Sequence, residues 1–170
     1  MTKYLRSMSF AATVAFALTG VQASAAPVGA TTPATGRAEI VKGLTLTAQS
    51  NLDLGKIVVW GNGTITLDTA GGIVCTASAL TCDPTGTPAT YKVTGSNNQT
   101  VTITKPDVTL SHQTDATAPS LTLKLTGQDT VLLPNSGSTG TTFSLGGQMN
   151  IPESVKDGVY SGNLNVTVQY

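Results

Sequence analysis

The chain has 170 residues, with nine basic against nine acidic side chains, 11% charged and 5% aromatic residues. So few cations, balanced by as many acids, argue against nucleic-acid binding, which needs a basic surface. The length and the 39% hydrophobic content suffice for one domain with a real core and argue against disorder.

The first 25 residues have the pattern of a secretory signal. Lys3 and Arg6 precede a short apolar run over Met8–Leu18, and a small-x-small triplet ends at Ala25. The pattern predicts export through the Sec pathway, with cleavage between Ala25 and Ala26; the alternative is an N-terminal helix of the domain. Removing two of the nine cations leaves seven basic against nine acidic groups, and no later stretch approaches the roughly 20 apolar residues of a membrane span.

Cys75 and Cys82 are the only cysteines, and both lie in the exported part. An even pair in an oxidising compartment predicts a disulfide that closes a short loop. The alternative, a thiol redox pair, prefers a two-residue spacing beside a helix, and neither feature is present.

The exported chain begins with an extension and continues as a run of strands. Residues 26–37 hold too many Pro and Gly residues to pack, which predicts a flexible extension, with the ordered domain over 38–170. Short alternating runs follow, separated by turn signals such as Gly61-Asn62-Gly63. The predicted strands cover residues 39–47, 52–60, 64–67, 91–94, 101–104, 108–110, 121–125, 143–145, 149–151 and 160–170.

This pattern predicts an all-β fold. No window of eleven or more residues keeps a 3.6-residue apolar period without Gly, Pro or β-branched residues intervening. Seven or more short strands between turns favour an antiparallel β-sandwich, and a barrel is the alternative.

The last eleven residues alternate without a break. The inward positions of this predicted strand are Tyr160, Gly162, Leu164, Val166, Val168 and Tyr170. The positions between them are Ser, Asn, Thr and Gln, so one face suits a core and the other suits water. Two interpretations remain open: an ordinary strand paired with earlier ones, or a sandwich that lacks a strand and is completed by another molecule through strand addition.

This terminal strand resembles the carboxyl-terminal strand of chaperone–usher pilin subunits. The likeness is closest to the spore-coat-U-like group and to a related family of small secreted proteobacterial proteins of unknown function. Leu44–Thr47 followed by Leu52–Gly55, the Gly71-Gly72 pair and the Tyr91–Gly95 strand are similar to that family's layout in the same order.

The resemblance implies an immunoglobulin-like fold without its last strand. It further implies a periplasmic chaperone that lends the missing strand, an outer-membrane usher, and donor-strand exchange into a polymer at the cell surface. A donor segment would lie either in the N-terminal extension, where Val28 is the one sizeable apolar residue, or at residues 38–41, which include Ala38 and Ile40.

The sequence contains no recognisable pattern of catalytic or metal-binding residues. His112, the only histidine, is predicted to be a surface residue in a polar loop, and the acids are scattered singly. Metal-ligand spacings and phosphate-binding glycine loops are absent, so we expect no enzyme activity, metal or cofactor.

We therefore expect a secreted, pilin-like structural subunit of a surface fibre or adhesive appendage. The alternative is a monomeric, secreted, non-catalytic β-sandwich module that binds carbohydrate or is otherwise surface-associated, with Trp60 and Tyr91 as the plausible stacking residues.

Overall fold

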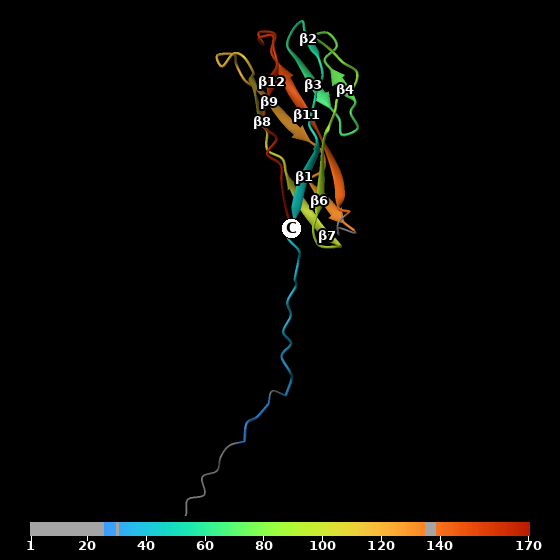
Figure 1. Ribbon diagram of the computed structural model, residues 1–170, viewed down its shortest axis with the longest axis vertical. Helices are drawn as coiled ribbons and strands as arrows, with labels where there is room; N and C mark the ends of the chain where they lie inside the picture. Colours follow the sequence, from blue (N-terminus) through green and yellow to red (C-terminus); the bar gives the residue numbers. More distant parts are fainter. Residues whose placement is uncertain (1–25, 30, 135–138) are drawn as a thin grey trace, which may run out of the picture. The chain divides into compact units, whose positions relative to one another are not determined.

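The computed structural model describes residues 26–29, 31–134 and 139–170, and these residues form strands and no helix. The chain divides into two units after Ala38. The described part of the first unit contains no strand, and its side chains are exposed. The second unit is an antiparallel β-sandwich (Figure 1). Its strands are β1 (Thr45–Ser50), β2 (Ile57–Val59), β3 (Gly63–Leu67), β4 (Ile73–Cys75), β5 (Leu80–Cys82), β6 (Ala89–Thr94), β7 (Gln99–Thr104), β8 (Val108–His112), β9 (Leu121–Thr126), β10 (Thr130–Leu133), β11 (Thr141–Ile151), β12 (Tyr160–Ser161) and β13 (Thr167–Gln169).

Most of these strands belong to one large sheet, in the order β1-β6-β11-β9-β8-β12; in addition β3 pairs with β11, and β4 pairs with β3. A second sheet has the order β10-β7-β13, and β2 pairs with β5. Consecutive strands change sheets: β7 leads into β8, and β9 into β10, so the same stretch of chain contributes to both layers.

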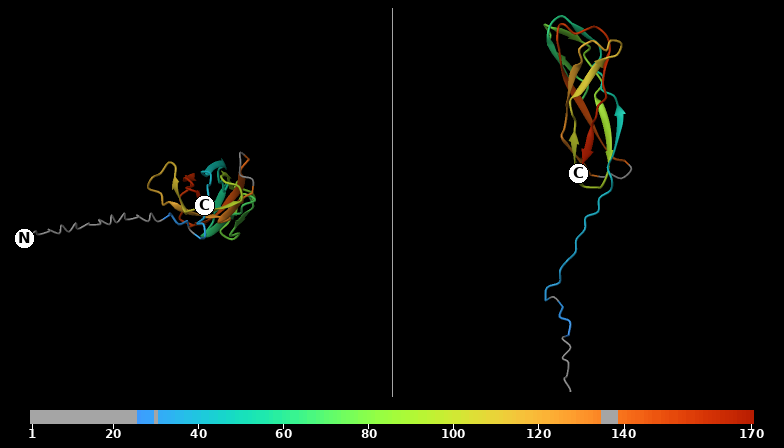
Figure 2. Two further views of the ribbon diagram at one scale, coloured as in Figure 1. Left: turned by 90° about the horizontal axis from the view of Figure 1, so that it is seen from below. Right: turned by 90° about the vertical axis from the view of Figure 1, so that its left-hand side faces the viewer.

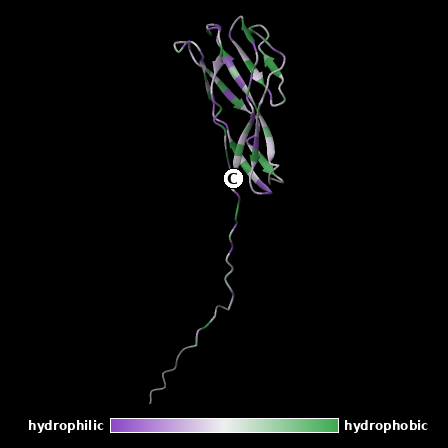
Figure 3. Cartoon of the chain, viewed as in Figure 1, coloured by the Kyte–Doolittle hydropathy of each residue, from purple (hydrophilic) through white to green (hydrophobic). Residues whose placement is uncertain are grey.

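Strict alternation produces the core. The even-numbered residues are buried along β8 and the odd-numbered ones along β9 as far as Leu125, and the residues between them are exposed, as the period of two in a strand requires. Figure 3 shows this alternation along the ribbons. Val93 and Leu145 of the large sheet and Val101 and Leu133 of the second sheet belong to one cluster and are fully buried.

The strands β3 and β6 occupy the same side of β11, one after the other. Leu67 pairs with Gly147 and Ala89 pairs with Leu145, so one residue of β11 separates the two partners. Along the chain, by contrast, residues 68–88 separate Leu67 at the end of β3 from Ala89 at the start of β6. These residues form an excursion that contains β4, β5 and both cysteines, after which the chain resumes its place beside β11.

Turn residues set the start of this excursion. The Asp68 carboxylate accepts hydrogen bonds from the backbone N–H groups of Ala70 and Gly72, both at 2.8 Å. These bonds favour the ionised form and lower the pKa of Asp68. Gly71 has φ of +99°, a conformation that other residues rarely adopt.

The terminal segment differs from the single strand that its alternation predicts. Tyr160 and Ser161 pair with β8, whereas Thr167–Gln169 pair with β7, and residues 162–166 between them form no ladder. The register also shifts by one residue between the two pairs, since Tyr160 faces His112 and Thr167 faces Thr104. The break arises because the partner segment itself passes from one sheet to the other between β7 and β8.

Other predicted boundaries also change. The first strand begins at Thr45 and not at residue 39, and only Ile57–Val59 of the predicted 52–60 strand is regular. The two predicted runs at 143–145 and 149–151 are one strand, β11. The turn at 61–63 joins β2 to β3, but these strands pair with β5 and with β4 and β11, so they are not a hairpin.

Candidate functional site

Seven strands have a single partner strand among the described residues, namely β1, β2, β4, β5, β10, β12 and β13, and the two that concern the site are β1 and β13. β1 pairs with β6 and β13 pairs with β7, which leaves the other edge of each without a strand. Leu44, Leu46, Leu164, Val166 and Val168 pack against the core from these segments, yet all five are only half-buried. The apolar face of both edges is therefore incompletely covered.

The last residue links these two segments at one end of the domain. The Tyr170 hydroxyl donates to the Lys42 carbonyl oxygen at 2.6 Å and accepts from the Ser96 N–H at 2.7 Å. A side chain at Gly95 would meet both the Tyr170 hydroxyl and Leu44. The start of β1 and the end of β13 therefore lie close together, with their unpaired edges in the same region of the domain.

The other predicted inward positions of the terminal segment have distinct roles. Tyr160 is half-buried, and its hydroxyl donates to the Lys156 carbonyl at 3.1 Å. Gly162 is exposed, but an added Cβ would overlap the Thr109 carbonyl, so the backbone lies too close to β8 for any side chain there.

His112 is buried at the end of β8, which corrects the expectation of a surface histidine in a loop. Its Nδ1 accepts from the backbone N–H of Asp115 at 3.0 Å and of Thr114 at 3.3 Å. Because Nδ1 is an acceptor, Nε2 carries the proton and donates to the Asp157 carbonyl at 2.9 Å. The ring also meets Tyr160 edge-on, with centroids 5.1 Å apart. His112 thus connects the turn after β8 to the loop that leads into β12.

An ion pair joins the same two loops. The Asp115 carboxylate accepts from Lys156 and from the Thr117 hydroxyl and N–H. Lys156 contributes most to lowering the pKa of Asp115 to about 2, and the Thr117 hydrogen bonds contribute further. The approach to the terminal strand is therefore fixed by a buried, hydrogen-bonded histidine and by a charged pair.

The predicted donor positions carry uncovered side chains. Val28 is 93% exposed and Ile40 92% exposed, and Ala38 is exposed as well. Ala26 is exposed too, while Ala25 and the predicted signal segment lie outside the described residues.

Cys75 and Cys82 form a disulfide, with Cα atoms 6.5 Å apart, as their spacing predicts. The bond joins β4 to β5 within the excursion, and Cys82 lies opposite Ile57 of β2. The sequence suggested only a loop tip here, because strands of three residues leave too short an alternation to recognise.

Replacing both cysteines by serine is expected to lower the free energy of unfolding by about 2–3 kcal/mol, since the bond closes a short loop. Urea denaturation of the Cys75→Ser/Cys82→Ser variant measures the loss. Dithiothreitol should destabilise the unmodified protein by the same amount and leave the variant unchanged. Equal midpoints for the variant and the oxidised protein would contradict the prediction.

The two aromatic residues expected to stack on a ligand lie in different environments. Tyr91 is buried, stacks on Phe143 with centroids 5.6 Å apart, and has its pKa raised by burial. It therefore faces the core. Trp60 is 70% exposed, and its Nε1 donates to the Thr81 hydroxyl at 3.2 Å.

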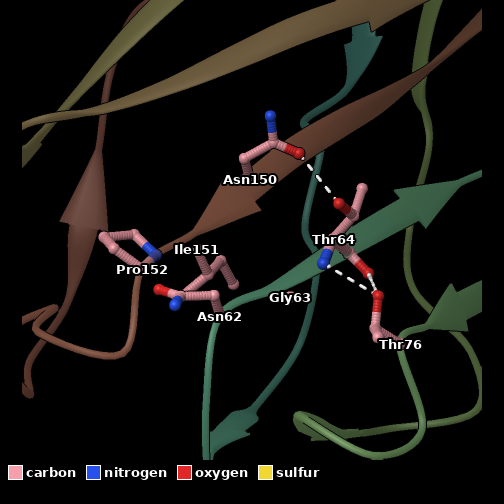
Figure 4. A pocket seen from close by; sticks show the side chains of 7 residues that line it. All are labelled: Asn62, Gly63, Thr64, Thr76, Asn150, Ile151 and Pro152. Carbon is pink, nitrogen blue, oxygen red and sulfur yellow. Dashed lines mark hydrogen bonds between the residues drawn. The ribbon is translucent and has the colours of Figure 1, made fainter.

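A hollow of about 500 Å³ opens at the turn that follows Trp60. It is lined by Asn62–Thr64, Thr76 and Asn150–Pro152 (Figure 4). Neither the alternation of β3 nor that of β11 indicates it, because its residues meet only through sheet pairing. Within the described part of the chain, no three His, Cys, Asp or Glu residues gather as metal ligands. Nor does that part contain a helix long and apolar enough to cross a membrane.

The fold and these edges define an all-β protein built as a stapled antiparallel sandwich. A family model described as a domain of unknown function, DUF4402, matches residues 44–170, so the chain belongs to the DUF4402 family. Comparison with curated proteins and with solved structures found no match.

Proposed function

We propose that this protein is a secreted, pilin-like structural subunit of a surface fibre, assembled by β-strand complementation. The observation that carries the proposal is the pair of unpaired edges on β1 and β13, whose apolar residues are half-buried. A strand inserted between them would cover those residues and satisfy the backbone groups of both edges.

The proposed occupant is the N-terminal extension of a second copy. Residues 26–41 reach about 50 Å when extended, which exceeds the roughly 20 Å length of a six-residue strand such as β1. Every second position from 28 to 40 holds Val, Ala, Thr, Ala, Gly, Ala and Ile in turn, while Pro, Gly, Thr, Arg and Glu occupy the positions between. This period of two matches an added strand with one small apolar face.

The exposure of Val28 and Ile40 supports the same occupant, since such side chains gain about 25 cal/mol per Å² when they leave water. Before assembly, the open edges would need protection from aggregation. The resemblance to chaperone–usher pilins supplies the proposed partners: a periplasmic chaperone that covers the edges and an outer-membrane usher that exports the subunit to the cell surface.

Adding a synthetic peptide of residues 26–41 to the exported chain is expected to raise its melting temperature by about 10 °C, because a stabilisation of roughly 3 kcal/mol has that effect in a domain of this size. Differential scanning calorimetry measures the shift. A peptide with Asp in place of Val28, Ala38 and Ile40 is the matched control and should give no shift.

Self-assembly provides an independent readout of the proposal. Ile40→Asp in the full exported chain should abolish oligomers seen by size-exclusion chromatography, whereas Val74→Asp, at another exposed apolar position outside the N-terminal segment, should retain them. A hyperstable, cooperative monomer that neither oligomerises nor gains stability from the peptide would overturn the proposal.

A further inference from the structure

The hollow beside Trp60 presents a specific set of hydrogen-bonding groups. The Asn62 Oδ1 accepts from the Glu153 N–H at 2.9 Å, and the Asn150 Oδ1 accepts from the Thr64 hydroxyl at 2.9 Å. The Thr76 hydroxyl accepts from the Thr64 N–H at 3.0 Å (Figure 4). The hydroxyls and amide oxygens are thus engaged inside the site.

The two amide nitrogens are not engaged in this way. Neither Asn62 Nδ2 nor Asn150 Nδ2 donates to another described residue, so the hollow offers four N–H donors on side chains whose orientation is already fixed by their oxygens. No residue that lines the hollow carries a charge. This set of donors suits an uncharged ligand that is rich in acceptor oxygens.

Trp60 adds an apolar surface to these donors. One residue, Gly61, separates Trp60 from Asn62 along the chain, so the Cα atoms of Trp60 and of this lining residue are within about 7 Å of each other. The hydrogen bond to Thr81 restrains the ring, and 70% of the residue remains exposed. A restrained aromatic face beside amide donors matches a pyranose, which has one face of C–H groups and a rim of hydroxyls.

We infer that the hollow at Asn62–Thr64, Thr76 and Asn150, together with Trp60, is a binding site for a neutral saccharide. Two of its parts come from the disulfide-stapled excursion: Thr76 lies between Cys75 and β5, and Thr81 lies on β5. The excursion does not contribute to the continuous pairing along β11 but does supply this site.

The site lies at the end of the sandwich opposite Tyr170. In both Figure 1 and the right-hand view of Figure 2, β2–β4 are at one end of the domain and the C-terminus is at the other. A saccharide there would leave the edges of β1 and β13 unobstructed. The inference goes beyond the proposed assembly and does not depend on it.

Trp60 is the only tryptophan, so its fluorescence reports on the site directly. The exported chain is titrated with cello-, manno- and galacto-oligosaccharides, and with sialylated oligosaccharides as the charged comparison. We expect a saturable change in emission with at least one neutral series and none with the sialylated set. No change with any neutral series up to about 10 mM, where even weak binding is visible, would overturn the inference, as would a response to sialylated sugars alone.

Variants separate the site from general effects on the fold. By isothermal titration with the responding sugar, Trp60→Ala and Asn150→Ala should each weaken binding about tenfold, equivalent to about 1.4 kcal/mol. Thr122→Ala, at an exposed position on β9, should leave it unchanged. Circular dichroism checks that each variant is folded, and undiminished binding by folded Trp60→Ala would contradict the assignment.

Discussion

Alanine at position 146 is expected to lower the free energy of unfolding by about 4 kcal/mol or more, an exceptional value for one methyl group. Gly146 is the single residue of β11 between the partners of β3 and β6. A Cβ there would overlap the Leu67 carbonyl oxygen and lie 3.0 Å from the Asp68 carbonyl carbon. Both are backbone atoms at the point where the excursion leaves the sheet, so no side-chain rotation relieves the overlap.

Urea denaturation of Gly146→Ala measures this loss, and two other glycines serve as controls. Gly43→Ala should be neutral, because nothing lies within 4 Å of its Cβ position. Gly147→Ala should have an intermediate effect, since its Cβ would meet the flexible end of the Leu123 side chain at 2.7 Å. If Gly146→Ala unfolds at the wild-type midpoint, β3 and β6 do not share one side of β11 as described.

The same feature explains why part of the fold could not be predicted from the sequence. The alternation around Ile65 and Leu67 and that around Tyr91 and Val93 predict two strands, and both strands are present. Their placement end to end along β11 depends on pairing between residues far apart in the chain. Its only local signal is the Gly146-Gly147 pair within an otherwise apolar alternation.

The terminal segment shows how far alternation alone reaches. It assigns the inward side correctly, because Leu164, Val166 and Val168 pack against the core. It does not reveal the break after Ser161, which follows from the change of sheet between β7 and β8. Alternation describes which face a residue occupies, whereas continuity depends on the neighbouring strand.

The burial of His112 follows from the same alternation. Val108, Leu110 and His112 share one face of β8, and all three are buried. The polar residues that follow His112 suggested a loop, but its position in the alternation places it on the core side. The polar hollow, by contrast, has no signal in the sequence, since Thr64 and Asn150 become neighbours only through the register of β3 and β11.

Gly158→Ala is expected to lower the free energy of unfolding by about 3 kcal/mol, within the range for a large single-residue effect. Gly158 has φ of +144°, a region that other residues rarely occupy, and an added Cβ would overlap the His112 ring. His112→Ala alone should cost about 2–3 kcal/mol through the loss of buried hydrogen bonds at both ring nitrogens.

The double variant distinguishes the steric effect from backbone strain. Removing the His112 ring relieves the overlap. The double variant should therefore lose at least about 1 kcal/mol less free energy of unfolding than the sum of the losses in the two single variants. In the His112→Ala background, Gly158→Ala should still lower the free energy of unfolding by about 1–2 kcal/mol, because the unfavourable φ remains. Strictly additive losses in urea denaturation would mean that Gly158 does not pack on His112.

This coupling also bears on assembly. The loop at Gly158 leads directly into Tyr160, and His112 fixes that loop through the Asp157 carbonyl. Loosening this loop should free β12, and with it the neighbouring edge of β13, before the core strands are disturbed. We therefore expect His112→Ala to reduce oligomer formation more than a core variant of similar stability loss outside β7 and β13, such as Leu125→Ala on β9, and size-exclusion chromatography at matched fractions of folded protein tests this difference. Equal oligomer content in the two variants would show that the terminal edge is positioned independently of His112.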